Sequence, residues 1–138
     1  MANLTAKETH GIIEGTEIVL ADYSICPIES IKVGDHLLGG GTVMRIINCT
    51  KSNSYDALAS LGENTLGKGL YIRGSHPIML DNEKWILPTA KFQAIISRSP
   101  ILYTIALDGA DFYYAGGYRV AAAEQPRDDC KQVNDGAE

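Results

Sequence analysis

The chain is poor in cysteine and in basic clusters, and each shortage excludes a class of protein. Its three cysteines, Cys26, Cys49 and Cys130, share no C-x-x-C spacing and no nearby histidine pair, so we expect no metal site. Twelve basic residues stand against 17 acidic ones, which gives a net charge of −5. No local cluster of Lys or Arg offsets this balance, and we expect no nucleic-acid partner and no cofactor.

Long apolar runs are also missing. No stretch is long enough to cross a bilayer, so the sequence predicts no membrane partner. The start, MANLTAKETHG, lacks the basic-then-apolar pattern of a secretory signal. An odd number of cysteines without such a signal is typical of a reducing compartment. We therefore expect a cytoplasmic location.

Helical periodicity is nearly absent, and short β-rich runs broken by Gly, Asp and Asn take its place. A length of 138 residues suits one domain with a real core. The pattern predicts an all-β protein. The expected strands cover residues 17–21, 35–38, 42–49, 69–72, 77–80, 85–87, 101–107, 112–115 and 118–122. Residues 50–68 read as a long loop or a loosely formed strand pair.

Two segments of the chain resemble each other. TEIVLADYSICPIESIKVGD, residues 16–35, runs strand, acidic turn, strand, proline and short helical turn. HPIMLDNEKWILPTAKF, residues 76–92, follows the same course. Two similar half-units predict a β-fold with a pseudo-two-fold axis.

Three blocks of sequence, in this order, resemble the Hint family, the domain shared by hedgehog autoprocessing regions and inteins. The first, residues 15–40, has Gly-Thr, an apolar strand, Ala-Asp, Pro-Ile-Glu-x-Ile and Val-Gly-Asp. The second, residues 74–92, has His-Pro, an acidic turn and Trp. The third, residues 102–124, has Tyr, Asp-Gly, an aromatic pair and Ala-Gly-Gly. The resemblance implies a Hint/intein-type horseshoe of short strands.

The resemblance also implies domain limits. The β-domain would cover residues 11–123, preceded by a flexible leader at 1–10 and followed by a polar, flexible tail at 124–138. The family's reaction begins when a Cys or Ser at the first position of the domain attacks the carbonyl before it. A T-x-x-H motif supplies donors, an Asp or His in the last block assists, and splicing members end in His-Asn.

Carried onto this chain, most of those groups are missing. The nucleophile's position falls on Gly11, and the T-x-x-H motif reads Arg73, Gly74, Ser75, His76. His76 is thus the one expected catalytic group that is kept. The remaining former-site positions hold other residues: Thr104 for Asp, Asp111 for His, and Ala121 and Ala122 for the closing His-Asn pair.

We therefore expect a Hint-like domain that has lost splicing and cleavage, is not an enzyme, and acts as a protein-binding or structural module. Its partner would be a protein or a host polypeptide, bound through the old cleft or by edge strands such as 112–122. The alternative is a Hint-type autoprocessing domain in an inactivated, engineered form.

Individual residues carry alternatives of their own. His76 either donates at an autoprocessing site or tethers two halves of the fold through hydrogen bonds. Arg73 either binds a carboxylate in the old cleft or pairs with Asp111 or Glu14. Cys26 could join His76 and Asp81 as a hydrolase triad, or be a small buried side chain. The aromatic residues form either a binding platform or a half-core, half-surface pattern; they are Trp85, Phe112, Tyr113, Tyr114 and Tyr118.

Overall fold

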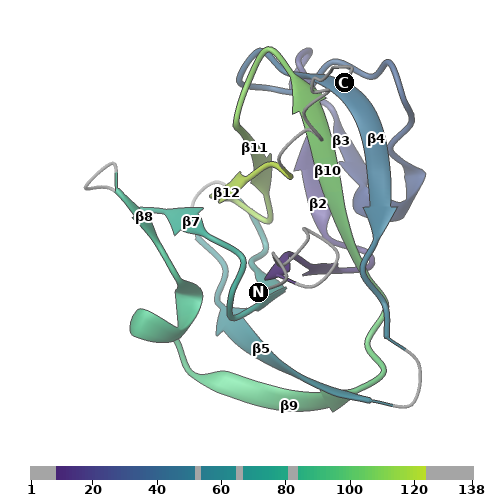
Figure 1. Ribbon diagram of the computed structural model, residues 1–138. Coiled ribbons are helices and arrows are strands. Elements are labelled where there is room, and N and C mark those ends of the chain that lie inside the picture. The colour runs from purple at the N-terminus through teal and green to yellow at the C-terminus, as the bar shows by residue number, and fades with distance from the viewer. Residues whose placement is uncertain (1–8, 52–53, 65–66, 81–83, 124–138) are drawn as a thin grey trace, which may run out of the picture.

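The protein consists of two antiparallel sheets whose strands interleave along the chain (Figure 1). The computed structural model describes residues 9–51, 54–64, 67–80 and 84–123. Within them lie the strands β1 (Ile12–Ile13), β2 (Glu17–Val19), β3 (Ile25–Pro27), β4 (Thr42–Asn48), β5 (Tyr55–Leu61), β6 (Leu70–Arg73), β7 (Ile78–Met79), β8 (Trp85–Ile86), β9 (Ala94–Arg98), β10 (Leu102–Asp108), β11 (Phe112–Ala115) and β12 (Tyr118–Ala121). Two short 3-10 helices, η1 (Ile28–Ser30) and η2 (Pro88–Ala90), complete the set.

Strand order reveals the predicted two-fold repeat. One six-stranded sheet, here sheet A, has the order β4-β10-β1-β6-β5-β9, and the other, sheet B, has the order β3-β2-β11-β12-β7-β8. Strands β1 to β5 map onto β6 to β10, because β1 and β6 are central in sheet A while β4 and β9 are its two edges. In sheet B, the hairpins β2-β3 and β7-β8 flank the β11-β12 hairpin. The all-β, pseudo-two-fold fold predicted from the sequence is confirmed.

The first repeated hairpin turns on an acidic residue. The Asp22 carboxylate accepts hydrogen bonds from the Ser24 amide at 3.0 Å and the Ser24 hydroxyl at 2.5 Å, which holds the pKa of Asp22 below its usual value. Tyr23 takes the left-handed conformation, with φ at 69°. In each half the second strand of the hairpin, β3 or β8, is followed by a 3-10 turn. Pro27 precedes η1, and Pro88 is the first residue of η2. The same local chemistry therefore builds both half-units.

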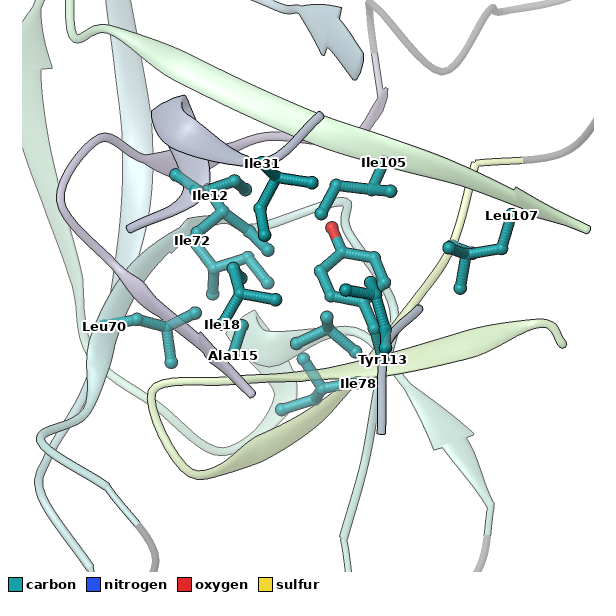
Figure 2. Packing of buried hydrophobic residues seen from close by; sticks show 14 of the residues in the cluster. Ile12, Ile18, Ile31, Leu70, Ile72, Ile78, Ile105, Leu107, Tyr113 and Ala115 are labelled. Carbon is teal, nitrogen blue, oxygen red and sulfur yellow. The ribbon is translucent and has the colours of Figure 1, made fainter. Parts of the chain in front are cut away.

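The core lies where the two sheets face each other (Figure 2). Ile12 and Ile72 come from the centre of sheet A, and Ile18 and Ile78 from the two hairpins of sheet B. Tyr113, from β11, stands among them and is fully buried. Burial of such side chains stabilises the fold by about 1.5–3 kcal/mol each, so the core ties both repeats to the central hairpin.

Most of the predicted strands are present to within two residues. Those expected at 42–49, 69–72, 101–107, 112–115 and 118–122 correspond to β4, β6, β10, β11 and β12. The strand expected at 35–38 is wrong, since only isolated bridges form there, at His36 and Leu37. The loop at Gly34–Asp35 bends because Gly34 has φ at 95°, and the segment therefore cannot extend into a ladder.

Of the two alternatives for residues 50–68, a long loop is wrong in its middle, and a paired strand lies there instead. β5 is a seven-residue strand with β6 on one side and β9 on the other. Its sequence, YDALASL, contains Asp, Ala and Ser, which have low β propensity, so pairing on both edges decides its conformation. β9 was not predicted either, because its apolar residues are adjacent rather than alternating.

The expectation that strands at 112–122 form an edge is also wrong. β11 pairs with β2 and β12, and β12 pairs with β7, so both strands lie inside sheet B. The edges of the two sheets are β4, β9, β3 and β8. Most of the leader at 1–10 and the tail at 124–138 lie outside the described residues, and the expected domain limits stay predictions.

Candidate functional site

The peptide bond between His10 and Gly11 is held at both of its polar atoms. Gly11 stands just before β1, which pairs with β6. The Arg73 amide donates to the Gly11 carbonyl at 2.8 Å. The Gly11 amide donates to Nδ1 of His76 at 3.1 Å, although 65 residues separate the two. The Arg73 guanidinium Nη1 donates to the His10 carbonyl at 2.8 Å. We call Gly11, Arg73, Ser75 and His76 the junction site.

His76 uses both ring nitrogens. Nδ1 accepts from Gly11, so the ring proton lies on Nε2, which donates to the Ala121 carbonyl at 2.7 Å. The side chain is fully buried, and the His10 ring lies 4.3 Å from it, centroid to centroid. Burial, followed by the nearby His10 and Arg73, holds the pKa of His76 well below its usual value. The ring is a neutral tether between the start of the domain and β12.

Arg73 is the charged centre of the junction site. Its Nε and Nη2 donate to the two carboxylate oxygens of Asp56 at 3.1 and 2.9 Å, and Nη2 also donates to the Cys49 carbonyl at 3.1 Å. The expected pairing with Asp111 or Glu14 is wrong. Asp56 lies on β5, which pairs with β6 beside Arg73, and this partner was not anticipated. The bidentate geometry fixes the guanidinium, so it presents Nη1 to the His10 carbonyl.

Ser75 extends the same backbone recognition by one residue. Its hydroxyl donates to the Thr9 carbonyl at 2.6 Å. The chain at residues 9–11 is therefore bound through four backbone groups, three carbonyls and one amide. None of these contacts requires a particular side chain at Thr9 or His10, so the junction site recognises the backbone of this segment.

The space for a side chain at Gly11 is narrow. A Cβ there would lie 3.1 Å from Cδ1 and 3.3 Å from Cβ of Leu102, and 3.6 Å from Cβ of Arg73. Leu102 is fully buried with Cys49 and Leu58 in a second apolar cluster. The two distances to Leu102 are shorter than ordinary van der Waals contacts, whereas the distance to Arg73 is ordinary. A Cys or Ser at this position would fit only if Leu102 moved.

The other predicted site positions are only partly brought together. Ala121 reaches the site through its carbonyl, and the Ala122 amide donates to the Asp111 carbonyl at 2.9 Å. Thr104 is buried on β10, and its hydroxyl shares a 3.2 Å hydrogen bond with the Tyr113 hydroxyl. Burial raises the pKa of the Tyr113 phenol. Thr104 therefore anchors a core tyrosine.

Sequence reasoning missed Asp56, the partner of Arg73. An acidic residue inside the run YDALASL, in a protein with a buried Arg, was the available signal. The signal was not used because this run was left open between a loop and a loosely formed strand pair. The Asp56 side chain is 12% exposed and that of Arg73 is 5% exposed, so the pair is screened from water and stronger than a surface ion pair.

The hydrolase triad considered for Cys26 is not available, because His76 is engaged elsewhere. Both nitrogens of His76 are engaged by Gly11 and Ala121, which leaves none for a thiol. Cys26 lies on β3, where burial, together with Asp35 and Glu29, raises the pKa of its thiol. A raised pKa disfavours the thiolate that such a reaction needs. Asp81 lies outside the described residues.

The aromatic residues divide between core and surface. Tyr113 is buried, whereas Phe112 and Tyr114 lie on the opposite side of β11 and are half-buried. The Arg119 guanidinium lies 4.7 Å from the Phe112 ring centroid and 5.6 Å from that of Tyr114. Their faces are thus occupied by a cation from the same hairpin.

Metal-binding clusters and membrane-spanning helices are both absent from the residues that the structure describes. No group of three or more His, Cys, Asp or Glu side chains is arranged to hold a metal ion within these residues. None of the described helices has the length and apolar character needed to span a bilayer.

Comparison with known proteins identifies the fold. No protein-family model matches the sequence, and no curated protein does. Among solved structures, a mutant Ssp DnaB mini-intein matches with a TM-score of 0.67 and 13% identity, over 88% of this chain and 97% of its own. The bacterial intein-like domain from Clostridium thermocellum matches with a TM-score of 0.60 and 16% identity, over 81% and 97%. The gp41-1 intein gives 0.60 and 14%, over 81% and 98%. The chain therefore has the all-β intein, or Hint, fold.

Proposed function

We propose that this chain, whose fold is that of the inteins, has lost autocatalytic splicing and cleavage and acts as a protein-binding or structural module. The observation that carries the proposal is the state of the His10–Gly11 peptide. Its amide lies on His76 and its carbonyl on Arg73, yet residue 11 has no side chain to attack with.

The chemistry of the first step makes this absence decisive. An acyl shift breaks the C–N bond before residue 11 and forms a C–S or C–O bond to the side chain of residue 11, whose displaced nitrogen takes up a proton. Glycine offers neither sulfur nor oxygen. Donors on the carbonyl lower the barrier to attack only if an attacking atom is present. At this junction they bind the intact peptide.

The second half of a splicing reaction also lacks its reagent. Release at the end of the domain requires an Asn side chain whose amide nitrogen attacks its own peptide carbonyl. Ala121 and Ala122 stand at the expected positions, and their methyl groups carry no nucleophile. Both ends of the domain are thus chemically inert for this pathway.

Fusion of reporter domains to both ends tests the proposal directly. We expect the fusion to stay intact during incubation with and without dithiothreitol, as measured by mass spectrometry of the whole protein. A specific break between His10 and Gly11, or beside Ala122, would contradict it. A fusion of an active intein in the same vector provides the positive control for detection.

A second candidate is an autoprocessing domain that has been inactivated by substitution. Arg73 and His76 favour it, since they still contact both polar atoms of the peptide that would be cleaved. Restoring Gly11→Cys together with Ala121→His and Ala122→Asn distinguishes the two. Cleavage by this triple variant would favour an inactivated enzyme.

The neighbourhood of Gly11 refines that experiment. Because Leu102 occupies the space next to Gly11, we expect the triple variant to fold, by circular dichroism, but to remain uncleaved. Adding Leu102→Ala opens room for the new thiol. Cleavage that appears only with Leu102→Ala would support a site that has closed after its chemistry was lost.

A further inference from the structure

The outer strand of sheet A is open on one side. β9 ends the strand order of this sheet, and β5 is its neighbour in the ladder. In Figure 1 the two strands form a curved arm that extends away from sheet B. An edge strand carries unpaired backbone groups, which offer a template to another strand.

The hydrogen bonds at the two ends of β9 show which backbone groups face outward. The Ser60 amide donates to the Gln93 carbonyl at 3.0 Å, and the Ser99 amide donates to the Ser54 carbonyl at 2.6 Å. Backbone groups alternate in direction along a strand. Gln93 and Ser99 face β5, and so does every second residue between them. The amides and carbonyls of Ala94, Ile96 and Arg98 therefore point away from the sheet.

The other three edges have features that limit pairing. β4 is covered at its start, since the Gly34 amide donates to the Val43 carbonyl and the Val43 amide donates to the Asp35 carbonyl, both at 2.8 Å. β3 ends in Pro27, which has no amide proton, and β8 is only two residues long. β9 has five residues, AIISR, with no proline and no lysine. We call the outward side of Ala94–Arg98 the β9 edge.

The side chains of the β9 edge are apolar on both faces of the strand. Ile96 is 69% exposed, and Ile95, on the opposite face, is 40% exposed. On the face of Ile96 lie Ala57, directly across on β5, and Tyr55, which is 67% exposed. A long edge with exposed branched side chains is a site for strand addition.

We infer that the β9 edge binds the β9 edge of a second copy of this chain, antiparallel, about a two-fold axis at Ile96. In this register Ile96 faces Ile96, and Ala94 faces Arg98 at both ends. The three outward residues of each strand then exchange about six backbone hydrogen bonds. The two sheets A become one continuous sheet.

Charge selects the antiparallel arrangement. Arg98 is exposed, and the ion pairs of the described residues do not include it. In the antiparallel register the two Arg98 side chains stand four residues apart along the ladder, about 13 Å. That separation exceeds the Debye length of about 8 Å at physiological ionic strength. A parallel register would set the two guanidinium groups side by side, where they repel.

This inference rests on the proposed binding role and names its partner as a second copy of this chain. Dimerisation is measured without any cleavage readout, so either proposal can fail while the other stands. Sedimentation velocity of the full chain at increasing concentration gives the test. We expect the fraction of dimer to rise with concentration. A monomer at every concentration up to the millimolar range would overturn the inference.

Two lysine variants locate the contact. Ile96→Lys places like charges opposite each other at the centre of the register, and we expect it to raise the dimer dissociation constant at least about tenfold. Val33→Lys is the matched control, since Val33 is also 69% exposed but lies outside both sheets. Equal weakening by both variants would overturn the assignment to β9.

A cysteine at the axis tests the register. In Ile96→Cys the two Cα atoms would stand about 5.5 Å apart, within the range that a disulfide spans. We expect a dithiothreitol-sensitive covalent dimer, beyond any formed by the parent chain. Ile95→Cys is the control, because residue 95 faces Ser97 of the other copy. More cross-linking at 95 than at 96 would rule out the two-fold axis at Ile96.

Discussion

The junction site and the β9 edge belong to the same sheet but differ in how their polar groups are satisfied. Around Gly11, one amide and three carbonyls of residues 9–11, a guanidinium and both nitrogens of an imidazole have partners within 3.1 Å. Along β9, the groups of Ala94, Ile96 and Arg98 face outward from the ladder. The contrast teaches that this molecule uses the junction site to hold its own chain, and leaves backbone groups of the β9 edge outside the ladder.

The largest expected effect concerns the ion pair within the junction site. Asp56→Ala leaves the buried guanidinium of Arg73 without its carboxylate, and we expect the free energy of unfolding to fall by about 3–5 kcal/mol. Urea denaturation followed by circular dichroism measures this. Replacing both partners, Asp56→Leu with Arg73→Met, removes the unpaired charge and should cost less than Asp56→Ala alone. An equal or larger loss in the double variant would contradict the assigned role.

The next effect concerns the space at the junction. Gly11→Ala forces a methyl group against Leu102, and we expect a loss of about 1–3 kcal/mol in the free energy of unfolding. Gly62→Ala is the matched control, since a Cβ there meets nothing within 4 Å. The same denaturation experiment compares them. If Gly11→Ala were as stable as the parent, Leu102 would not close the space for a side chain at residue 11.

The pH dependence of stability follows from the neutral ring of His76. Its pKa is depressed in the folded state, while an unfolded histidine titrates near about 6.5. Below that pH the unfolded chain binds a proton that the folded chain excludes. Stability is therefore lost as pH falls from about 6.5 toward the folded pKa, with a slope of up to about 1.4 kcal/mol per pH unit.

Urea denaturation at several values between about pH 7.5 and about pH 5, where an ordinary histidine titrates, measures that slope. His76→Gln should flatten it, because glutamine can donate and accept without titrating. His36→Gln serves as a control, since His36 lies outside the junction site, where its ring contacts the Thr42 hydroxyl. An unchanged slope in His76→Gln would mean that other groups set the pH dependence.

The smallest effect on folding is expected at the β9 edge. Ile96 is mostly exposed, so Ile96→Lys should change the free energy of unfolding of the dilute monomer by no more than about 0.5 kcal/mol. Denaturation at low micromolar concentration gives this value. If Ile96→Lys loses the dimer but keeps the stability of the monomer, its effect is the opposite of the one expected for Asp56→Ala. A large destabilisation would show instead that Ile96 belongs to the folding core.

Much of the fold was predictable because local chemistry and global topology agree. The acidic turn at Asp22, the prolines at the starts of η1 and η2 and the alternating strands indicated the repeat and most strand positions. β5 was left open between a loop and a loosely formed strand pair, because its conformation depends on pairing with β6 and β9, and the β9 sequence has a weak strand pattern. Propensity alone cannot report pairing of that kind.

The site was predictable only in part. The spacing of the family blocks placed Gly11, Arg73 and His76 in one region, and the structure brings these three together. It could not provide the partner of Arg73, because a carboxylate on an unrecognised strand has no signature in the sequence. Asp56 became part of the site only through the pairing of β5 with β6.

By itself, the amino-acid sequence determined which groups are present: an imidazole at 76, a guanidinium at 73, and no nucleophile at 11. It also determined the two half-units, since turns and short strands depend on neighbouring residues. Tertiary structure alone decided that Asp56 neutralises Arg73, that Leu102 fills the place of a side chain at 11, and that β9 forms an edge. These outcomes depend on contacts between distant segments, which form only when the two sheets close around their shared core.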